Sequence, residues 1–300
     1  MVETPILYIT FARPEYASQS FAAIKKAKPK KLYFYSNKAR NEKTDEVARN
    51  EEVRSYIKQI DWDCEVKTWF REEYVDVYTS LWGAIDWIFS NEEKAIIIEE
   101  DVVSSLAFFD FVDQIIDKYK DNPHVWMISG NNCTPRYNPD KLSYWPTRFI
   151  HIFGWASWRN RWFGIDKEMK EWPEFRVSKA FSQYWGMKIC TIVQRSYYDK
   201  VYKNYKKYNP WDFVFSYNMV KNRSYCIVPK VNLVADVGVS GVHHKQKKVS
   251  PYQTDSSLPD KFSITNIPSE ILPTPYDKGH FYSYILGGLI RRKITKYFGI

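Results

Sequence analysis

Three consecutive carboxylates, Glu99, Glu100 and Asp101, follow directly after the apolar residues 95–98. The β-branched apolar run predicts a strand buried on both faces, as in a parallel sheet. Open α/β sheets bind ligands at the carboxyl ends of such strands. Three adjacent acids repel one another, and Mg²⁺ or Mn²⁺ relieves that repulsion through hard oxygen ligands, often shared with substrate phosphates. The pattern predicts a metal–diphosphate site; the alternative is a solvated acidic turn that caps the next helix.

A fourth carboxylate, Asp212, lies between two bulky aromatic residues, Trp211 and Phe213. Partial desolvation by such neighbours raises the pKa of a carboxylate and makes it a better general base. We therefore expect Asp212 to accept a proton during catalysis. The alternative is that Asp212 is the N-cap of the helix predicted after Pro210.

Histidine and arginine side chains could take part in the same chemistry. His243 and His244 follow the glycine-punctuated residues 236–241, and a neutral imidazole can complete a Mn²⁺ shell. The alternative is a pair of solvated loop histidines. Arg13 follows the first predicted strand, where its planar guanidinium would suit a nucleotide or a diphosphate. An ordinary surface arginine is the alternative there.

The elements that must position these residues alternate between strand and helix. Strands are predicted at residues 6–10, 31–36, 64–69, 95–98 and 125–129. Helices are predicted at residues 16–26, 38–60, 74–89 and 107–120. This repeated alternation predicts an α/β fold with a mainly parallel sheet, covered faces and right-handed crossovers.

The pattern changes after Gly130. We expect an extended loop at 131–147, a dense aromatic segment at 149–162, a basic helix at 182–207 and a strand at 225–233. Pro229 should limit that strand to an edge or an end of the sheet. Residues 246–280 are polar and rich in proline with few core signals, and residues 281–300 are apolar first and basic last. Three regions follow, with boundaries at 1–130, 131–245 and 246–300.

Composition limits the class of protein. The 300 residues carry a net charge of +9, which favours an anionic partner such as a nucleotide or a lipid surface. Aromatic residues make up 18% of the chain, and their rings can pack in a core or stack on sugars and bases. The four cysteines have no CxxC spacing, which argues against a zinc ribbon or a dithiol site. The absence of a signal peptide and of a membrane-spanning run predicts a cytoplasmic protein.

The order of these motifs resembles that of the GT-A glycosyltransferases. It is most similar to the branch that contains the N-acetylglucosaminyltransferase that initiates complex N-glycans, and to bacterial relatives in that family. The matching motifs are Ile98-Glu99-Glu100-Asp101, Phe108-Phe109, Trp126 to Asn132, Phe153-Gly154-Trp155 with Trp158, Trp211-Asp212, Cys226-Ile227-Val228-Pro229 and Gly238-Val239-Ser240. Together they span roughly residues 5–245 in the family's order.

The resemblance implies transfer of a sugar from a nucleotide diphosphate sugar, most simply a UDP-sugar, to an acceptor hydroxyl with inversion. Residues 1–130 would be the Rossmann-like donor half, and residues 131–245 the acceptor-side half of the same domain. Asp101, helped by Glu99 and by His243 or His244, would hold Mn²⁺ or Mg²⁺, and Asp212 would be the base. The donor contacts it implies are Arg13, Ser36, Glu99, Glu100, Asn131, Asn132 and Trp155.

The sequence departs from the family pattern at three positions. The middle acid is Glu100 rather than Asp, the Trp-Asp motif lacks its second acid and has Phe213 there, and Ser36 ends the second strand where the animal enzyme reads uracil with an acid nearby. These differences concern the donor base and the sugar. They leave Asp101 at the position that binds the cation.

Other functions remain open from the sequence. One is a retaining transferase on the same fold, and another is a metal-dependent phosphohydrolase or nuclease, which would usually need ligands for two ions. A third is a non-catalytic basic module that binds nucleic acid or membrane, although no nucleic-acid motif is visible and we expect no such partner.

The C-terminal residues raise the question of membrane contact. Residues 284–300 combine apolar residues with interleaved cations, a composition that suits an interfacial helix on the inner face of an anionic membrane. A lipid-linked or other glycan acceptor in bacterial surface polysaccharide synthesis would make such contact useful. The alternative is a terminal helix packed on the domain, with its basic face in water.

Overall fold

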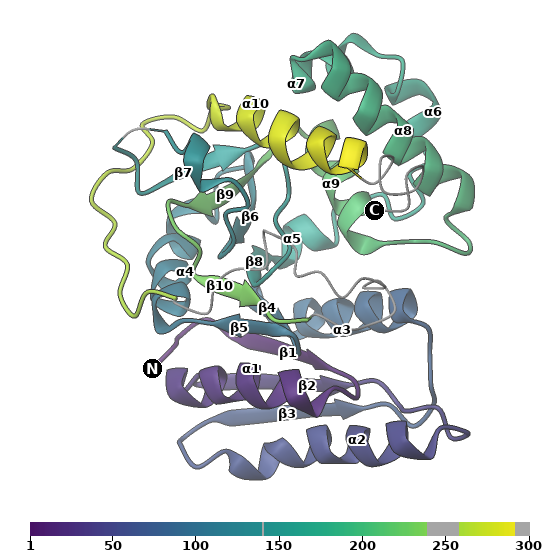
Figure 1. Ribbon diagram of the computed structural model, residues 1–300, viewed down its shortest axis with the longest axis vertical. Coiled ribbons are helices and arrows are strands. Elements are labelled where there is room, and N and C mark those ends of the chain that lie inside the picture. The colour runs from purple at the N-terminus through teal and green to yellow at the C-terminus, as the bar shows by residue number, and fades with distance from the viewer. Residues whose placement is uncertain (140, 239–257, 292–300) are drawn as a thin grey trace.

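The computed structural model describes residues 1–139, 141–238 and 258–291, and its centre is a mixed sheet of eight strands in the order β3-β2-β1-β4-β8-β6-β9-β7. Figure 1 shows this order from the lower to the upper part of the molecule. The strands are β1 (Ile6–Thr10), β2 (Lys31–Ser36), β3 (Glu65–Phe70), β4 (Lys94–Glu99), β6 (Val125–Ser129), β7 (Tyr144–Thr147), β8 (Trp155–Trp158) and β9 (Tyr225–Pro229). Six strands share one direction, and β7 and β8 run against them. The predicted mainly parallel α/β sheet is confirmed.

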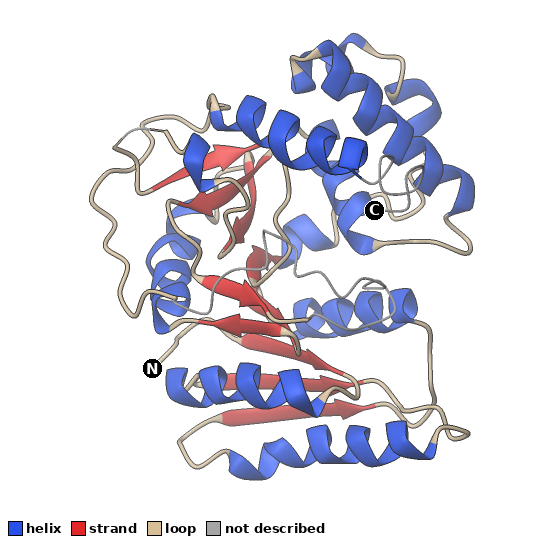
Figure 2. Ribbon diagram, viewed as in Figure 1, coloured by secondary structure: helices blue, strands red, loops and turns tan. Residues whose placement is uncertain are grey.

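Helices cover both faces of the sheet, as Figure 2 shows. The helices are α1 (Pro14–Ala27), α2 (Thr44–Ser55), α3 (Val77–Asn91), α4 (Leu106–Tyr119), α5 (Arg159–Trp162), α6 (Trp172–Phe175), α7 (Lys179–Trp185), α8 (Lys188–Asn204), α9 (Trp211–Lys221) and α10 (Tyr276–His280), with 3-10 turns at Tyr56–Gln59 and Pro135–Tyr137. Alternate residues of a strand face opposite sides. Ile96 and Ile98 therefore pack with α1 and α4, whereas Ala95 and Ile97 pack with α3 and α9.

The acids do not cap the helix that follows them. A short strand, β5 (Val102–Ser104), separates them from α4, and the side chain of Ser105 caps α4 by accepting a hydrogen bond from the backbone N–H of Phe108. β5 pairs antiparallel with β10 (Val234–Asp236) in a separate two-stranded sheet. This pairing brings two chain segments more than 130 residues apart to the same edge.

Two sequence predictions about the second half of the chain are corrected. The predicted loop at 131–147 ends in β7, which pairs antiparallel with β9. The predicted single helix at 182–207 is two helices, α7 and α8, because Gly186 adopts a left-handed φ of 64° that ends α7. Pro229 is the last residue of β9, in agreement with the prediction that it lies at an edge or an end.

The C-terminal segment contributes to the core, contrary to the expectation that residues 246–280 carry few core signals. In α10 the side chains of Tyr276, Asp277 and His280 are buried, and Phe281 after it is buried too. Asp277 holds the segment to the end of β7, because it accepts hydrogen bonds from Thr147 and from the Arg148 guanidinium at 2.9 Å. The helix continues through a π-helical turn (Phe281–Leu286) to residue 291.

None of the helices within the described ranges has the length and apolar character that crossing a bilayer requires. All four cysteines lie within these ranges and are free thiols. Three of them, Cys133, Cys190 and Cys226, are buried, and burial raises the pKa of each.

Candidate active site

The acidic edge, defined here as Glu99, Glu100 and Asp101, lies where β4 ends beside β1. Ile9 of β1 is the register partner of Glu99, so the loop between β1 and α1 lies directly against the acids. Glu99 shares a strand face with Ile97 and therefore points to the side covered by α3 and α9. Glu100 and Asp101 follow the end of the strand, and both contact Arg13. The surroundings of the three acids therefore differ.

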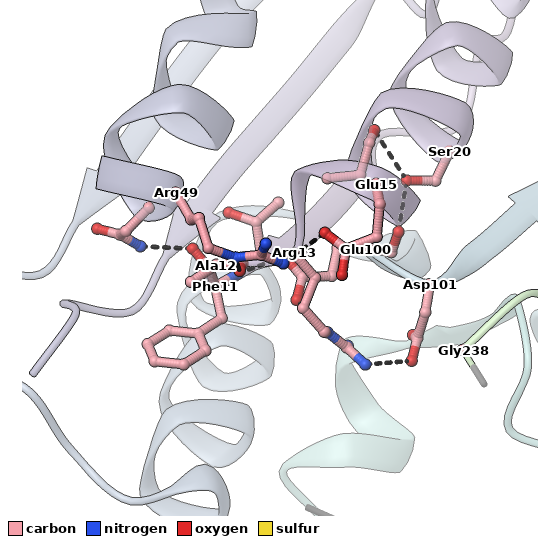
Figure 3. A network of polar contacts seen from close by, with 12 residues as sticks. Phe11, Ala12, Arg13, Glu15, Ser20, Arg49, Glu100, Asp101 and Gly238 are labelled. Atoms are coloured by element: carbon pink, nitrogen blue, oxygen red, sulfur yellow. Dashed lines mark hydrogen bonds and ion pairs between the residues drawn. The ribbon is translucent and has the colours of Figure 1, made fainter. Parts of the chain in front are cut away.

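Glu100 is a structural anchor. Its side chain is only 3% exposed, and its carboxylate accepts hydrogen bonds from the backbone N–H of Phe11 at 2.8 Å and from Nε of Arg13 at 2.6 Å. Its backbone carbonyl accepts a hydrogen bond from Ser20 at 2.8 Å. Figure 3 shows these contacts around the start of α1. Glu100 therefore holds the loop between β1 and α1 in this structure, and its predicted contact with the donor stays a prediction.

Arg13 bridges the two acids that follow β4. Its Nε donates to Glu100, and its Nη1 lies 2.9 Å from Oδ2 of Asp101 (Figure 3). Burial lowers the pKa of the Arg13 guanidinium, but Asp101 and Glu100 together raise it by a larger amount. The net pKa is therefore raised, and Arg13 stays charged. Arg13 and Asp101 keep 28% and 18% of their side chains exposed, which leaves both accessible to a ligand.

Asp236 belongs to the same edge, although sequence reasoning did not select it. It ends β10 as the register partner of Val102, and the N–H of Val237 donates to the carbonyl of Asp101 at 2.9 Å. Gly238 lies so close that a Cβ added to it would be 2.5 Å from Oδ2 of Asp101. An acid followed two residues later by a glycine is the local signal that could have indicated this close approach.

The electrostatics of this edge are those of crowded negative charge. Burial, followed by repulsion from Asp101, raises the pKa of Glu99 to about 8; Asp212 and Asp236 contribute in the same direction, while Arg13 opposes them. One arginine therefore does not neutralise the surrounding acids. Asp212 and Asp236 therefore add to the repulsion at Glu99, although they are far apart from it in the sequence.

The donor atoms at this edge suit a divalent cation. Glu99, Asp101 and Asp236 offer only carboxylate oxygens, which Mg²⁺ and Mn²⁺ prefer. Among the residues that the structure describes, no group of three or more His, Cys, Asp or Glu side chains is placed so that it could hold a metal ion by itself. Such an arrangement agrees with ions that use one or two carboxylates and complete their shell with substrate phosphates. Asp101 and Glu99 are the residues that would hold the ion.

Asp212 lies in the first turn of α9 and lines a cavity. Pro210 occupies the N-cap position, so the predicted alternative of Asp212 as the N-cap is wrong. Burial raises the pKa of Asp212 to about 6, although the backbone N–H of Phe213 acts in the opposite direction. Near neutral pH this carboxylate is mostly ionised yet basic, which suits a general base.

The cavity beside Asp212 measures about 540 Å³ and is here called the aromatic pocket. Its walls come from the segments 131–133 and 149–153, from α7, α8 and α9, and from the C-terminal helix at Tyr284, Ile285 and Gly288. Asn131 is among its lining residues and donates from its side chain to Asn232 at 3.1 Å. The predicted residues Asn131 and Asp212 thus lie on one cavity.

Three of the residues predicted to contact the donor are buried in packing. Ser36 is fully buried and accepts hydrogen bonds from Asn50 and Arg54. Asn132 is 1% exposed and holds its loop to β9 through the carbonyl of Pro229. Trp155 is also 1% exposed.

The Trp155 ring stacks on Trp211 with centroids 4.7 Å apart. These three side chains are buried in packing in this structure, and their contact with a donor stays a prediction. His243 and His244 lie outside the described residues.

Comparison with known proteins gives structural similarity only. The sequence matches no known family profile and no curated protein. The structure is similar to that of mouse xyloside xylosyltransferase 1, with a TM-score of 0.36 and 12% identity over 73% of this chain and 81% of that one. It is similar to the glycosyltransferase GlyE of Streptococcus pneumoniae, with a TM-score of 0.35 and 8% identity over 75% and 45% of the two chains.

A UDP-glucose pyrophosphorylase complexed with UDP-glucose has a TM-score of 0.38 and 7% identity over 78% of this chain and 94% of that one. Similarity at this level does not establish a shared activity.

Proposed function

We propose that the protein is a metal-dependent glycosyltransferase that moves a sugar from a nucleotide diphosphate sugar to an acceptor hydroxyl with inversion. One observation carries the proposal. The acidic edge, with the accessible Arg13, interacts electrostatically with Asp212, a buried carboxylate with a raised pKa that lines a separate cavity. A leaving diphosphate needs the first of these features, and an acceptor hydroxyl needs the second.

In this mechanism each residue of the candidate site has one role. Arg13 exchanges its contact with Asp101 for an oxygen of the diphosphate, while Glu100 keeps the guanidinium oriented through Nε. A divalent cation on Asp101 and Glu99 would neutralise charge on the leaving group. Asp212 takes the proton of the acceptor hydroxyl as that oxygen bonds to the anomeric carbon and the bond from this carbon to the diphosphate breaks. We assign Asp236 to positioning the backbone beside Asp101.

The proposal includes finer points that rest on the sequence, either through the motif resemblance or through its charge. We propose a UDP-sugar donor, Mn²⁺ as the cation, and a hexosyl or N-acetylhexosaminyl group for transfer. The acceptor would be a glycan or lipid-linked saccharide of a bacterial surface polymer. Contact of residues 284–300 with an anionic membrane, which would make the enzyme peripheral on the inner face, rests on the sequence charge.

A thermal-shift screen tests the proposal. UDP, GDP and CMP compounds and their sugars are added to the full chain with Mn²⁺, with uridine as the control that lacks phosphate. A ligand at about 100 times its Kd adds about 2.7 kcal/mol to the free energy of unfolding, so the Tm should rise measurably with one nucleotide class. Chelation with EDTA should remove the shift.

Two outcomes would contradict the proposal. If no nucleotide diphosphate raises the Tm, or if the shift is the same after chelation, the acidic edge does not bind a metal–diphosphate. For an active donor, the anomeric configuration of the product, read by NMR, separates inversion from retention, and a retained configuration would remove Asp212 as a base acting in one displacement.

A further inference from the structure

The aromatic pocket has a composition that selects its occupant. Aromatic rings line it from several elements, among them Phe149, Trp185, Tyr197, Phe213 and Tyr284. Apart from the carboxylate of Asp212 and the thiol of Cys133, the polar groups that lie between them are amides, hydroxyls and imidazoles. Rings that alternate with neutral hydrogen-bonding groups offer stacking faces and specific polar contacts to a ligand that is both apolar and polar.

The charges of the pocket differ from those of the whole chain. The chain carries a net charge of +9, yet among the described residues no lysine or arginine lines this pocket, and the acid that lines it is Asp212. Burial lowers the pKa of His151 to about 3 and also lowers the pKa of His280, so both rings are neutral at physiological pH. A phosphate or carboxylate in the pocket would face Asp212 without any counter-charge.

His151 is the unexplained polar group of the pocket. Its side chain is 3% exposed, and neither ring nitrogen has a hydrogen-bond partner in the described part of the chain. Its ring contacts His280 with centroids 4.9 Å apart. A neutral imidazole offers one N–H donor and one nitrogen acceptor, and leaving both unsatisfied in a buried site costs stability. A ligand hydroxyl can satisfy either one.

We infer that the aromatic pocket binds an uncharged sugar ring of the acceptor, with its attacked hydroxyl at Asp212 and another hydroxyl bonded to His151. This inference rests on the proposed function for the direction of the attacked hydroxyl. Hydroxyls pair with the imidazole and with neutral groups such as Gln194, and the faces of the sugar ring stack on the aromatic walls. The acidic edge would bind the charged diphosphate of the donor, and this pocket would bind the uncharged acceptor sugar.

The C-terminal helix offers a substitution that fills the pocket without disturbing the fold. Gly288 lines the pocket within a helix, and a Cβ added there would meet none of the described atoms within 4 Å. We expect Gly288→Phe to place a ring at the wall of the cavity. Ile290 is 51% exposed and is not a lining residue, so Ile290→Phe adds the same ring outside and is the matched control.

The experiment measures binding of neutral and charged glycosides by saturation-transfer difference NMR. The probes are the methyl glycosides of glucose, galactose and N-acetylglucosamine, compared with methyl glucuronide and glucose 6-phosphate, all with the full chain, UDP and Mn²⁺. We expect at least one neutral glycoside to bind at least tenfold more tightly than the charged probes. Gly288→Phe and His151→Phe should each weaken it at least tenfold, and Ile290→Phe should leave it unchanged.

The outcomes separate this inference from the proposed function. Binding of no neutral glycoside, equal binding of the charged probes, or equal loss in Ile290→Phe would overturn the inference even if calorimetry shows normal UDP binding. Failure of UDP and Mn²⁺ to bind, together with specific binding of a neutral glycoside, would overturn the proposed function and leave the pocket assigned. His151→Phe should keep or raise the Tm, whereas a histidine needed only for the fold would lower it.

Discussion

The acidic edge and the aromatic pocket are neighbours with opposite physical character. At the edge, Glu99, Asp101 and Asp236 place several acids around one arginine, and Arg13 forms ion pairs with Glu100 and Asp101. In the pocket, charge is nearly absent and a buried histidine has no hydrogen-bond partner among the described residues. Asp212 connects the two regions, since it raises the pKa of Glu99 and also lines the pocket. Under the proposed function, two substrates of unlike charge would meet at this carboxylate.

Among substitutions at the acidic edge, we expect the largest effect from a change of Asp101. Asp101→Asn should abolish turnover and remove the Mn²⁺-dependent part of nucleotide binding, because the neutral amide is a poor ligand for a hard cation. Calorimetric titration of UDP with and without Mn²⁺ measures the binding. Asp117→Asn is the matched control, since Asp117 pairs with Lys94 away from the edge. Full activity in Asp101→Asn would show that the edge is not the metal site.

Asp212→Asn separates the two regions kinetically. Loss of the general base should lower kcat by about 10²–10⁴ while nucleotide affinity stays nearly constant. In the wild type, kcat/KM should fall about tenfold per pH unit below the pKa of about 6, because the base must be ionised. Steady-state kinetics between pH 5 and 8 check both statements. An unchanged kcat in the variant would remove Asp212 from the mechanism.

Glu99 gives a smaller effect that concerns stability. The pKa of this carboxyl is about 8 in the folded protein against an ordinary value of 4.5, so the folded state holds its proton over that window. The free energy of unfolding should therefore fall as the pH rises from about 4.5 to about 8, by an amount on the order of a few kcal/mol.

Glu99→Gln should remove that fall, and Mn²⁺ should reduce it in the wild type by stabilising the ionised carboxylate. Denaturant unfolding at several pH values measures the effect. Identical pH profiles for the variant and the wild type would mean that the pKa of Glu99 is not raised in the folded protein.

The sequence was sufficient for the features that depend on local pattern. Apolar runs such as residues 95–98 predict the strands, and the acids after that run lie at the end of β4 as expected. The sequence predicted a special environment for Asp212 from its aromatic neighbours, and its raised pKa agrees. Each of these inferences needed only residues adjacent in the chain.

The features that the sequence did not predict depend on distant pairing. Asp236 reaches the edge through β10 and β5, which pair across more than 130 residues. Trp155 stacks on Trp211 in the core, and Glu100 accepts hydrogen bonds from the loop after β1. The C-terminal helix closes the aromatic pocket although its sequence resembles a surface helix. No local pattern distinguishes such residues from exposed ones.

The most direct test is a crystal of the full chain soaked with Mn²⁺ and UDP, measured near the manganese absorption edge. We predict an anomalous peak within about 2.3 Å of an Asp101 oxygen, and the manganese at this peak should also contact the diphosphate. The Arg13 side chain should be turned from Asp101 toward a phosphate oxygen. If the peak lies elsewhere, or if the Arg13–Asp101 ion pair persists beside bound UDP, the acidic edge is not the donor site.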